Sequence, residues 1–125
     1  MVKKVFQSDQ VAPPGGAYSQ ALRAGDFIFV AGTGPVDSSG DVAATTIEAQ
    51  TALTLENLKL ILENAEASLA HVVKTTVHLS DLALFEKFND VYAQFFSDPK
   101  PVRTTVGSQL LDILVEIDVV AYVGN

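Results

Sequence analysis

An arginine and a glutamate near the end of the chain are the side chains best suited to chemistry. Arg103 lies in "PKPVRTTVG" (residues 99–107), where β-branched residues alternate as they do on a half-buried strand. Glu116 lies in the next apolar segment, again between apolar positions. A guanidinium can bind a carboxylate through two parallel hydrogen bonds, and a nearby glutamate can hold or deprotonate a water. The two residues are therefore candidates for binding and proton transfer.

The same alternation predicts where the two side chains point. Arg103 and Glu116 both fall out of phase with the apolar residues of their strands, so both are expected on the sheet face away from the helices. There they could bind a ligand together. Alternatively, they could pair with each other as a structural ion bridge between strands or subunits. Spacing alone leaves both alternatives open.

Other residues give weaker indications. "GTGP" (32–35) lacks the lysine and Ser/Thr of a phosphate-binding loop, and no serine lies in a G-x-S-x-G elbow. His71 and His78 are seven apart on a predicted strand, hence on opposite faces, and cannot share a metal ion. Tyr18 follows two glycines and is compatible with a packed strand aromatic whose hydroxyl reaches the surface.

Composition narrows the class of protein. The 125 residues fit a single domain over 1–125, and 48% of them are hydrophobic, so we expect apolar surface to be buried against another subunit. The net charge of −7 and the lack of a basic run argue against nucleic-acid binding. Without cysteine the chain has no disulfide and no thiolate nucleophile. No apolar stretch resembles a signal peptide or a membrane span, so a cytoplasmic location and no membrane partner are expected.

The elements that must position these residues follow the order β-β-β-α-β-α-β-β. Strands are predicted over 2–7, 18–23, 26–32, 71–79, 102–107 and 112–123. The first helix begins with a capping box formed by Thr45 and Glu48. Its apolar stripe consists of Ile47, Thr51, Leu55, Leu58, Leu62, Ala65 and Leu69.

The second helix is capped by Ser80 and Asp81 and ends before Pro99. Its buried stripe consists of Phe85, Phe88, Tyr92 and Phe95. Because each helix has one apolar face, both are expected on one side of a single sheet, an α+β fold. In the last strand the face expected under the helices consists of Val115, Ile117, Val119, Ala121 and Val123, and the other face carries Leu114, Glu116, Asp118, Val120 and Tyr122. This face is too apolar for open water, and we expect it to meet other copies of the chain.

Several separated segments resemble one family, the reactive intermediate deaminase (Rid, or YjgF) family. "APPGGAYSQA" resembles its A-P-x-x-x-G-x-Y-S-Q-A opening, and "FIFVAGTGPVD" its F-x-S-G-Q-x-P-x-D strand and loop. "AQTALTLENLKLILENA" and "VVKTTVHLSDLALFEKFNDVYAQFF" resemble its two helical segments, and "KPVRTTV" and "LVEID" its closing strands. These segments span almost the whole chain in the family's order.

The resemblance implies a chorismate-mutase-like fold, a homotrimer, and clefts between neighbouring subunits. It also implies hydrolysis of carboxylate-bearing imines and enamines, such as 2-aminoacrylate, to a 2-keto acid and ammonia, with no metal or organic cofactor. By position, Arg103 stands where the family binds the substrate carboxylate, Glu116 where it positions water, and Tyr18 where a tyrosine assists. Gly32 and Thr33 lie in the ligand-binding loop, and Phe88 and Asn89 on the helix that walls the cleft.

Two departures from the family pattern lie near the predicted cleft. The connection between Arg103 and Glu116 is shorter than the family's, with "QLLDI" in place of its L-P-x-G-x turn. The family's S-G-Q is Ala31-Gly32-Thr33 here. They indicate either a deaminase with a specialised substrate, or a non-catalytic trimer that binds 2-keto acids or amino acids in a regulatory role.

Overall fold

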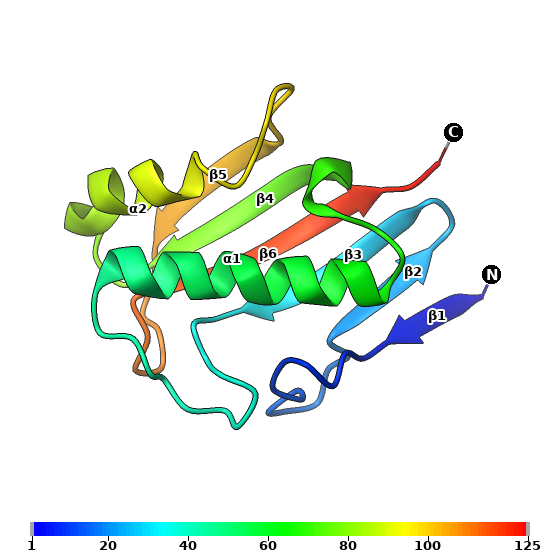
Figure 1. The fold of residues 1–125 in the computed structure, drawn as a ribbon, viewed down its shortest axis with the longest axis horizontal. Coiled ribbons are helices and arrows are strands. Elements are labelled where there is room, and N and C mark those ends of the chain that lie inside the picture. The colour runs from blue at the N-terminus through cyan, green and yellow to red at the C-terminus, as the bar shows by residue number, and fades with distance from the viewer. Residues whose placement is uncertain (1, 125) are drawn as a thin grey trace.

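A computed structural model describes residues 2–124, in which six strands form one sheet and the helices cover one of its faces (Figure 1). The strands are β1 (Lys3–Phe6), β2 (Ala21–Ala24), β3 (Phe27–Thr33), β4 (Val72–Leu79), β5 (Val102–Gly107) and β6 (Val115–Tyr122). The helices are α1 (Ile47–Asn64) and α2 (Phe85–Tyr92), with 3-10 turns η1 (Leu69–His71) and η2 (Leu82–Leu84). The predicted α+β class and the order of strands and long helices are confirmed.

The strand order places the two candidate residues differently in the sheet. The order is β1-β2-β3-β6-β4-β5, and every neighbouring pair is antiparallel except β4 and β5, which are parallel. α2 lies in the connection from β4 to β5, as a parallel pair requires a crossover. Glu116 therefore stands on a central strand, whereas Arg103 stands on an edge strand.

Helix α1 crosses the sheet and buries its apolar stripe against it (Figure 1). Its cap is Thr46, whose hydroxyl accepts a hydrogen bond from the Ala49 amide at 3.1 Å. The prediction of Thr45 as the cap is wrong by one residue, because Thr46 directly precedes the first helical residue. The helix ends at Asn64, so Leu69 lies in η1 rather than on the predicted stripe.

Helix α2 presents aromatic side chains to β4 and β5. Phe88 and Tyr92 are buried, as predicted, and Phe95 is partly buried beyond the helix end. The Asp81 carboxylate accepts a hydrogen bond from the Ala83 amide at 2.9 Å, which caps η2, the turn that leads into α2. Asp81 therefore acts as a cap, as predicted, but it caps the turn η2 and not helix α2 itself.

Two strands begin later than predicted. The segment predicted as a strand from residue 18 becomes β2 only at Ala21, so Tyr18 lies in the preceding loop. The last strand begins at Val115 rather than at residue 112, because Asp112 has a φ of 60° and turns the chain. On β6 the predicted helix-side face is confirmed, since Val115, Ile117, Val119 and Ala121 are all buried.

Candidate functional site

Arg103 lies under helix α2, where one face of that helix surrounds its guanidinium. Nη1 of Arg103 donates a hydrogen bond to Oδ1 of Asn89 at 2.7 Å. The guanidinium carbon lies 4.7 Å from the ring centroid of Tyr92, 5.4 Å from that of Phe85 and 5.8 Å from that of Phe88. Each cation–π contact of this kind contributes about 0.5–2 kcal/mol. The aromatic wall thus stabilises the charge without neutralising it.

Within residues 2–124, Arg103 has no acidic partner. The ion pairs of the described chain join Arg23 to Asp26, His78 to Asp118 and Lys100 to Asp98. An unneutralised, partly buried arginine is costly unless an anion completes it. The remaining guanidinium N–H groups can meet a carboxylate in the bidentate geometry that favours arginine over lysine.

The prediction that Arg103 and Glu116 share a sheet face is wrong. Arg103 stands beside Thr75 in the β4–β5 register, and Thr75 stands beside the buried Val119 of β6. Arg103 therefore faces the helices. Glu116 stands beside His78 and faces the other way, onto the uncovered side of the sheet. Within residues 2–124 of one chain the two residues form no ion bridge, so that alternative is left only as a bridge between subunits.

On strand β5 the arginine points toward the helices and the valines point away from them, which is the reverse of the predicted arrangement. Its apolar residues Val102 and Val106 point to the uncovered side, with Val102 67% exposed, while Arg103 and Thr105 point toward α2. The prediction assumed that the apolar positions of every strand lie under the helices. An edge strand does not have to obey that rule, and here the aromatic face of α2 accommodates the cation of Arg103.

A second half of the candidate site surrounds Glu116. A pocket of about 400 Å³ is lined by Glu116, Tyr18, Gly32 and Thr33, together with the loop containing Asp112. Tyr18 is 53% exposed, and its hydroxyl accepts a hydrogen bond from the Gly15 amide at 3.2 Å. The pocket therefore joins a carboxylate, a phenol and backbone groups of β3. This is a set that can hold a polar ligand and move a proton.

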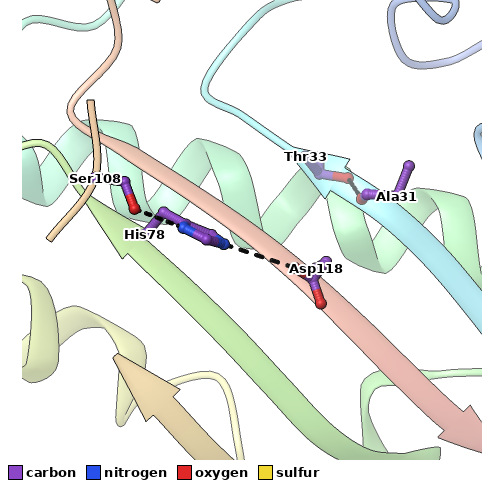
Figure 2. Close-up of polar contacts among 5 residues, drawn as sticks. All are labelled: Ala31, Thr33, His78, Ser108 and Asp118. Carbon is purple, nitrogen blue, oxygen red and sulfur yellow. Dashed lines mark hydrogen bonds and ion pairs between the residues drawn. The ribbon is translucent and has the colours of Figure 1, made fainter. Parts of the chain in front are cut away.

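Gly32 allows Glu116 to lie flat against β3. A Cβ atom on Gly32 would stand 2.9 Å from Cδ and 3.0 Å from Oε2 of Glu116, closer than real contacts permit. The β3–β6 register shifts between Val30 and Thr33, an irregularity that brings Gly32 to this position. The hydroxyl of Thr33 donates to the carbonyl of Ala31 at 2.9 Å, so it turns back onto its own strand (Figure 2).

Two buried amides of α1 fix the loops that border this pocket. Nδ2 of Asn57 donates to the carbonyls of Gly34 and Val36 at 3.0 and 2.8 Å. Gln50 accepts from the Leu114 amide at 2.8 Å. The loop after β3 and the entry to β6 are thereby tied to the same helix, which fixes Gly32 and Glu116 relative to each other.

A polar network lies beside Glu116 on the uncovered face. Figure 2 shows His78 between Ser108 and Asp118, with its Nδ1 2.7 Å from the Ser108 hydroxyl oxygen and its Nε2 3.9 Å from Oδ2 of Asp118. His78 and Glu116 are direct cross-strand neighbours in the register. The sequence offers His78 only as a possible metal ligand and does not reveal this network, because Ser108 is thirty residues away.

The uncovered face is otherwise apolar. Phe27, Phe29, Val102, Val106 and Tyr122 are each more than one third exposed. The register places them on the side of the sheet that carries Glu116, and the rings of Phe27 and Tyr122 lie 5.3 Å apart. This arrangement fits the expectation of contacts with other copies.

The predicted site residues thus divide into two groups. Tyr18, Gly32, Thr33 and Glu116 line one pocket, whereas Arg103 and Asn89 lie together under α2. Phe88 is fully buried in the described chain, and its ring centroid lies 5.8 Å from the guanidinium carbon of Arg103. The helical spacing predicts Tyr92 only as a residue of the buried stripe. Its spacing from Phe85, Phe88 and Asn89 was the available signal that it shares their helix face.

No group of three or more candidate metal-ligating side chains gathers among residues 2–124. None of the helices in this part of the chain is long and apolar enough to cross a membrane.

Comparison with known proteins identifies relatives over nearly the full length. The family model described as Endoribonuclease L-PSP matches residues 9–123. A RutC family protein of Pyrococcus abyssi is 45% identical, with 98% of each chain covered. Reactive Intermediate Deaminase A of Arabidopsis thaliana, a chloroplastic protein, is 38% identical over 96% of this chain and 66% of its own.

A solved structure shares the whole architecture. Escherichia coli TdcF, crystallised with bound serine, superposes with a TM-score of 0.87 at 32% identity, covering 95% of this chain and 98% of that protein. The fold, the family model and the curated relatives agree with the motifs around Tyr18, Arg103 and Glu116. This chain therefore belongs to the reactive intermediate deaminase (Rid/YjgF) family.

Proposed function

We propose that this protein hydrolyses small carboxylate-bearing imines and enamines, of the 2-iminopropionate and 2-aminoacrylate type, to the 2-keto acid and ammonia. The observation that carries the proposal is the environment of Arg103. It is a partly buried guanidinium held by Asn89 and three aromatic rings, with no acidic partner in residues 2–124. Such a group is suited to bind the carboxylate of a small substrate.

Arg103 and Glu116 act on one substrate only if two copies of the chain meet. In one protomer they point to opposite faces of the sheet, with β4 between their strands. A molecule of a few carbon atoms cannot reach both. We therefore propose a homotrimer with the site between subunits, in which Arg103 comes from one copy and the pocket of Glu116, Tyr18 and Gly32 from its neighbour. The exposed apolar residues of the uncovered face support such contacts.

The reaction then proceeds by positioning and proton transfer. Arg103 binds the carboxylate, and Glu116 accepts a proton from water as the water oxygen bonds to the imine carbon. The π electrons of the C=N bond move to nitrogen, which takes up a proton. In the resulting carbinolamine Glu116 takes the hydroxyl proton and passes it to the amino nitrogen, so the C–N bond breaks toward nitrogen, ammonia leaves and the oxygen forms the carbonyl. An enamine first takes a proton at its terminal carbon. No cofactor takes part.

The proposal agrees with what the relatives are called. The Arabidopsis protein is named a reactive intermediate deaminase, and the TdcF crystal contains serine, a small carboxylate-bearing amino acid. The family model carries an endoribonuclease name, and RNA cleavage is a competing activity. The net charge of −7 disfavours it, because binding a polyanion rests on concentrated positive charge. A cytoplasmic location remains a prediction from the sequence.

The test generates 2-iminopropionate in solution with an amino-acid oxidase, or 2-aminoacrylate with a dehydratase. Ammonia and keto-acid formation is then followed with and without the protein. We expect acceleration by the wild type and loss of that acceleration in Arg103→Ala.

If no imine is hydrolysed faster but 2-keto acids still bind in calorimetry, the protein is instead a non-catalytic binder of small carboxylates with a regulatory role. The departures from the family pattern at Ala31-Gly32-Thr33 and in residues 109–113 are the observations that favour this alternative. Full activity of Arg103→Ala would contradict the assigned site.

A further inference from the structure

Helix α2 presents four side chains to Arg103 from one face. Phe85, Phe88, Asn89 and Tyr92 are spaced i, i+3, i+4 and i+7, which is the spacing of one side of a helix. Asn89 supplies the hydrogen bond and the three rings supply the aromatic contacts. Of these rings Tyr92 is the nearest, with its centroid 4.7 Å from the guanidinium carbon.

Tyr92 is itself fixed on three sides. Its hydroxyl lies 2.8 Å from Oγ1 of Thr75 in a buried hydrogen bond. Its ring centroid lies 5.4 Å from that of Phe88 and 4.8 Å from that of Phe96. Thr75 is the register partner of Arg103, so the backbone that fixes the tyrosine is adjacent to the backbone that carries the arginine.

One hydrogen bond does not fix the plane of a guanidinium. The bond from Nη1 to Asn89 leaves the group free to swing about that contact. A flat ring held against it restricts the swing, so the remaining N–H groups keep one outward direction. A ligand that meets a pre-oriented guanidinium does not have to order it on binding, which improves its affinity.

We propose that Tyr92, fixed by Thr75, is a positioning residue that orients the Arg103 guanidinium and thereby makes the site selective for carboxylates over neutral groups. Tyr92 is 5% exposed, so it acts through the arginine rather than by touching the ligand. The ring beside the guanidinium is a neutral phenol, and burial raises the pKa of Tyr92 further above its usual 10.0. The identity of the ligand rests on the proposed function. The ordering of Arg103 by Tyr92 rests only on the contacts described above.

The binding test compares pyruvate with its neutral amide by calorimetry. For Tyr92→Leu we expect pyruvate to bind roughly tenfold more weakly, while the dissociation constant of the amide changes by less than about twofold. Only the charged ligand needs the guanidinium of Arg103 to be oriented for two parallel hydrogen bonds. Tyr92→Phe, which keeps the ring, is expected to recover most of the affinity, and Thr75→Val to lie between them. With the imine substrate, KM should rise in Tyr92→Leu while kcat changes little.

Ile28→Val is the matched control, because Ile28 is a fully buried residue of β3 outside the aromatic wall. Its small packing loss should leave both affinities unchanged. Equal weakening of pyruvate and amide in Tyr92→Leu, or wild-type pyruvate affinity in a folded Tyr92→Leu protein, would overturn the proposal.

A second readout separates this inference from the proposed function. Relaxation of the ¹⁵Nε signal of Arg103 reports the order of the guanidinium without any ligand. We expect it to be rigid in the wild type and in Ile28→Val, and mobile in Tyr92→Leu. If the wild type binds no pyruvate, the proposed function fails while this measurement still decides the role of Tyr92. An equally rigid Arg103 in Tyr92→Leu refutes that role.

Discussion

The carboxylate of Glu116 lies so close to the backbone of Gly32 that any side chain at position 32 would collide with it. A Cβ there would stand 2.9 Å from Cδ of Glu116. The loop between β3 and α1 and the start of β6 are both tied to α1, by Asn57 and Gln50. The glycine and the glutamate are therefore held together by the fold rather than by a direct hydrogen bond.

Gly32→Ala is expected to reduce kcat/KM by about ten- to a hundredfold, because displacing a catalytic group by an ångström has costs of this order. Stability should change by less than about 1 kcal/mol, since the atom that must move is the end of a flexible side chain. Steady-state kinetics and urea unfolding measure the two effects. Gly107→Ala is the control, because its Cβ would make only an ordinary contact, 3.4 Å from Leu82. Unchanged kinetics in Gly32→Ala would show that Glu116 does not need its present position.

Mixing two inactive variants tests whether the site is shared between copies. Arg103→Ala and Glu116→Gln should each be inactive alone. Unfolded together in equal amounts and refolded, they should recover about a quarter of the wild-type activity, since one interface in four then pairs an intact arginine with an intact glutamate. Activity assays before and after mixing provide the measurement. If mixed assemblies form but stay inactive, the two residues belong to one protomer's site or to different functions.

Alkaline pH should destabilise the protein through Tyr92. Burial raises the pKa of this phenol above 10.0, so the unfolded chain releases the proton at a lower pH than the folded protein does. Stability is therefore fully present below pH 10 and falls above it, by up to about 1.4 kcal/mol per pH unit for one proton. Urea unfolding at pH 9 and at about pH 11 should show this fall in the wild type and a smaller one in Tyr92→Phe. An identical fall in both proteins would assign the effect to other groups.

Asn57→Leu tests the tie between α1 and the loop after β3. The substitution leaves the carbonyls of Gly34 and Val36 without their donors, which should cost about 1–3 kcal/mol of unfolding free energy. Urea denaturation measures the loss. Leu60→Ala, at a partly buried position of the same helix, controls for a simple change in packing. If Asn57→Leu loses stability but keeps kcat/KM, the loop position is not needed for catalysis.

The buried faces could be predicted from the sequence where apolar residues recur with the period of a helix or a strand. Most of the α1 stripe, Phe88 and Tyr92 of α2, and the helix-side residues of β6 are buried as predicted, because each of these elements packs one face against the sheet. The predicted stripe residues Leu69, Phe85 and Phe95 are only partly buried. The boundaries that differ, at residue 18 and residue 112, depend on local turns. Aspartate tolerates the positive φ of Asp112 better than most residues do, but the residue type alone does not require that conformation.

The orientation of Arg103 could not be predicted from alternation. Alternation correctly separates Arg103 from Val102, but it does not say which of the two faces the helices cover on an edge strand. The aromatic face of α2 accommodates the cation, and the uncovered side takes the valines. The parallel pairing of β4 with β5, which decides this outcome, involves residues far apart in the chain.

The placement of Arg103 and Glu116 on opposite faces has a consequence for the proposed homotrimer. If the site lies between subunits as proposed, a lone subunit holds each half of it but no whole one, so the rate per subunit becomes a function of protein concentration. Dilution below the dissociation constant of the assembly would stop turnover without unfolding a single chain. The synthesis level of the protein would then set both how much catalyst is present and whether it works at all.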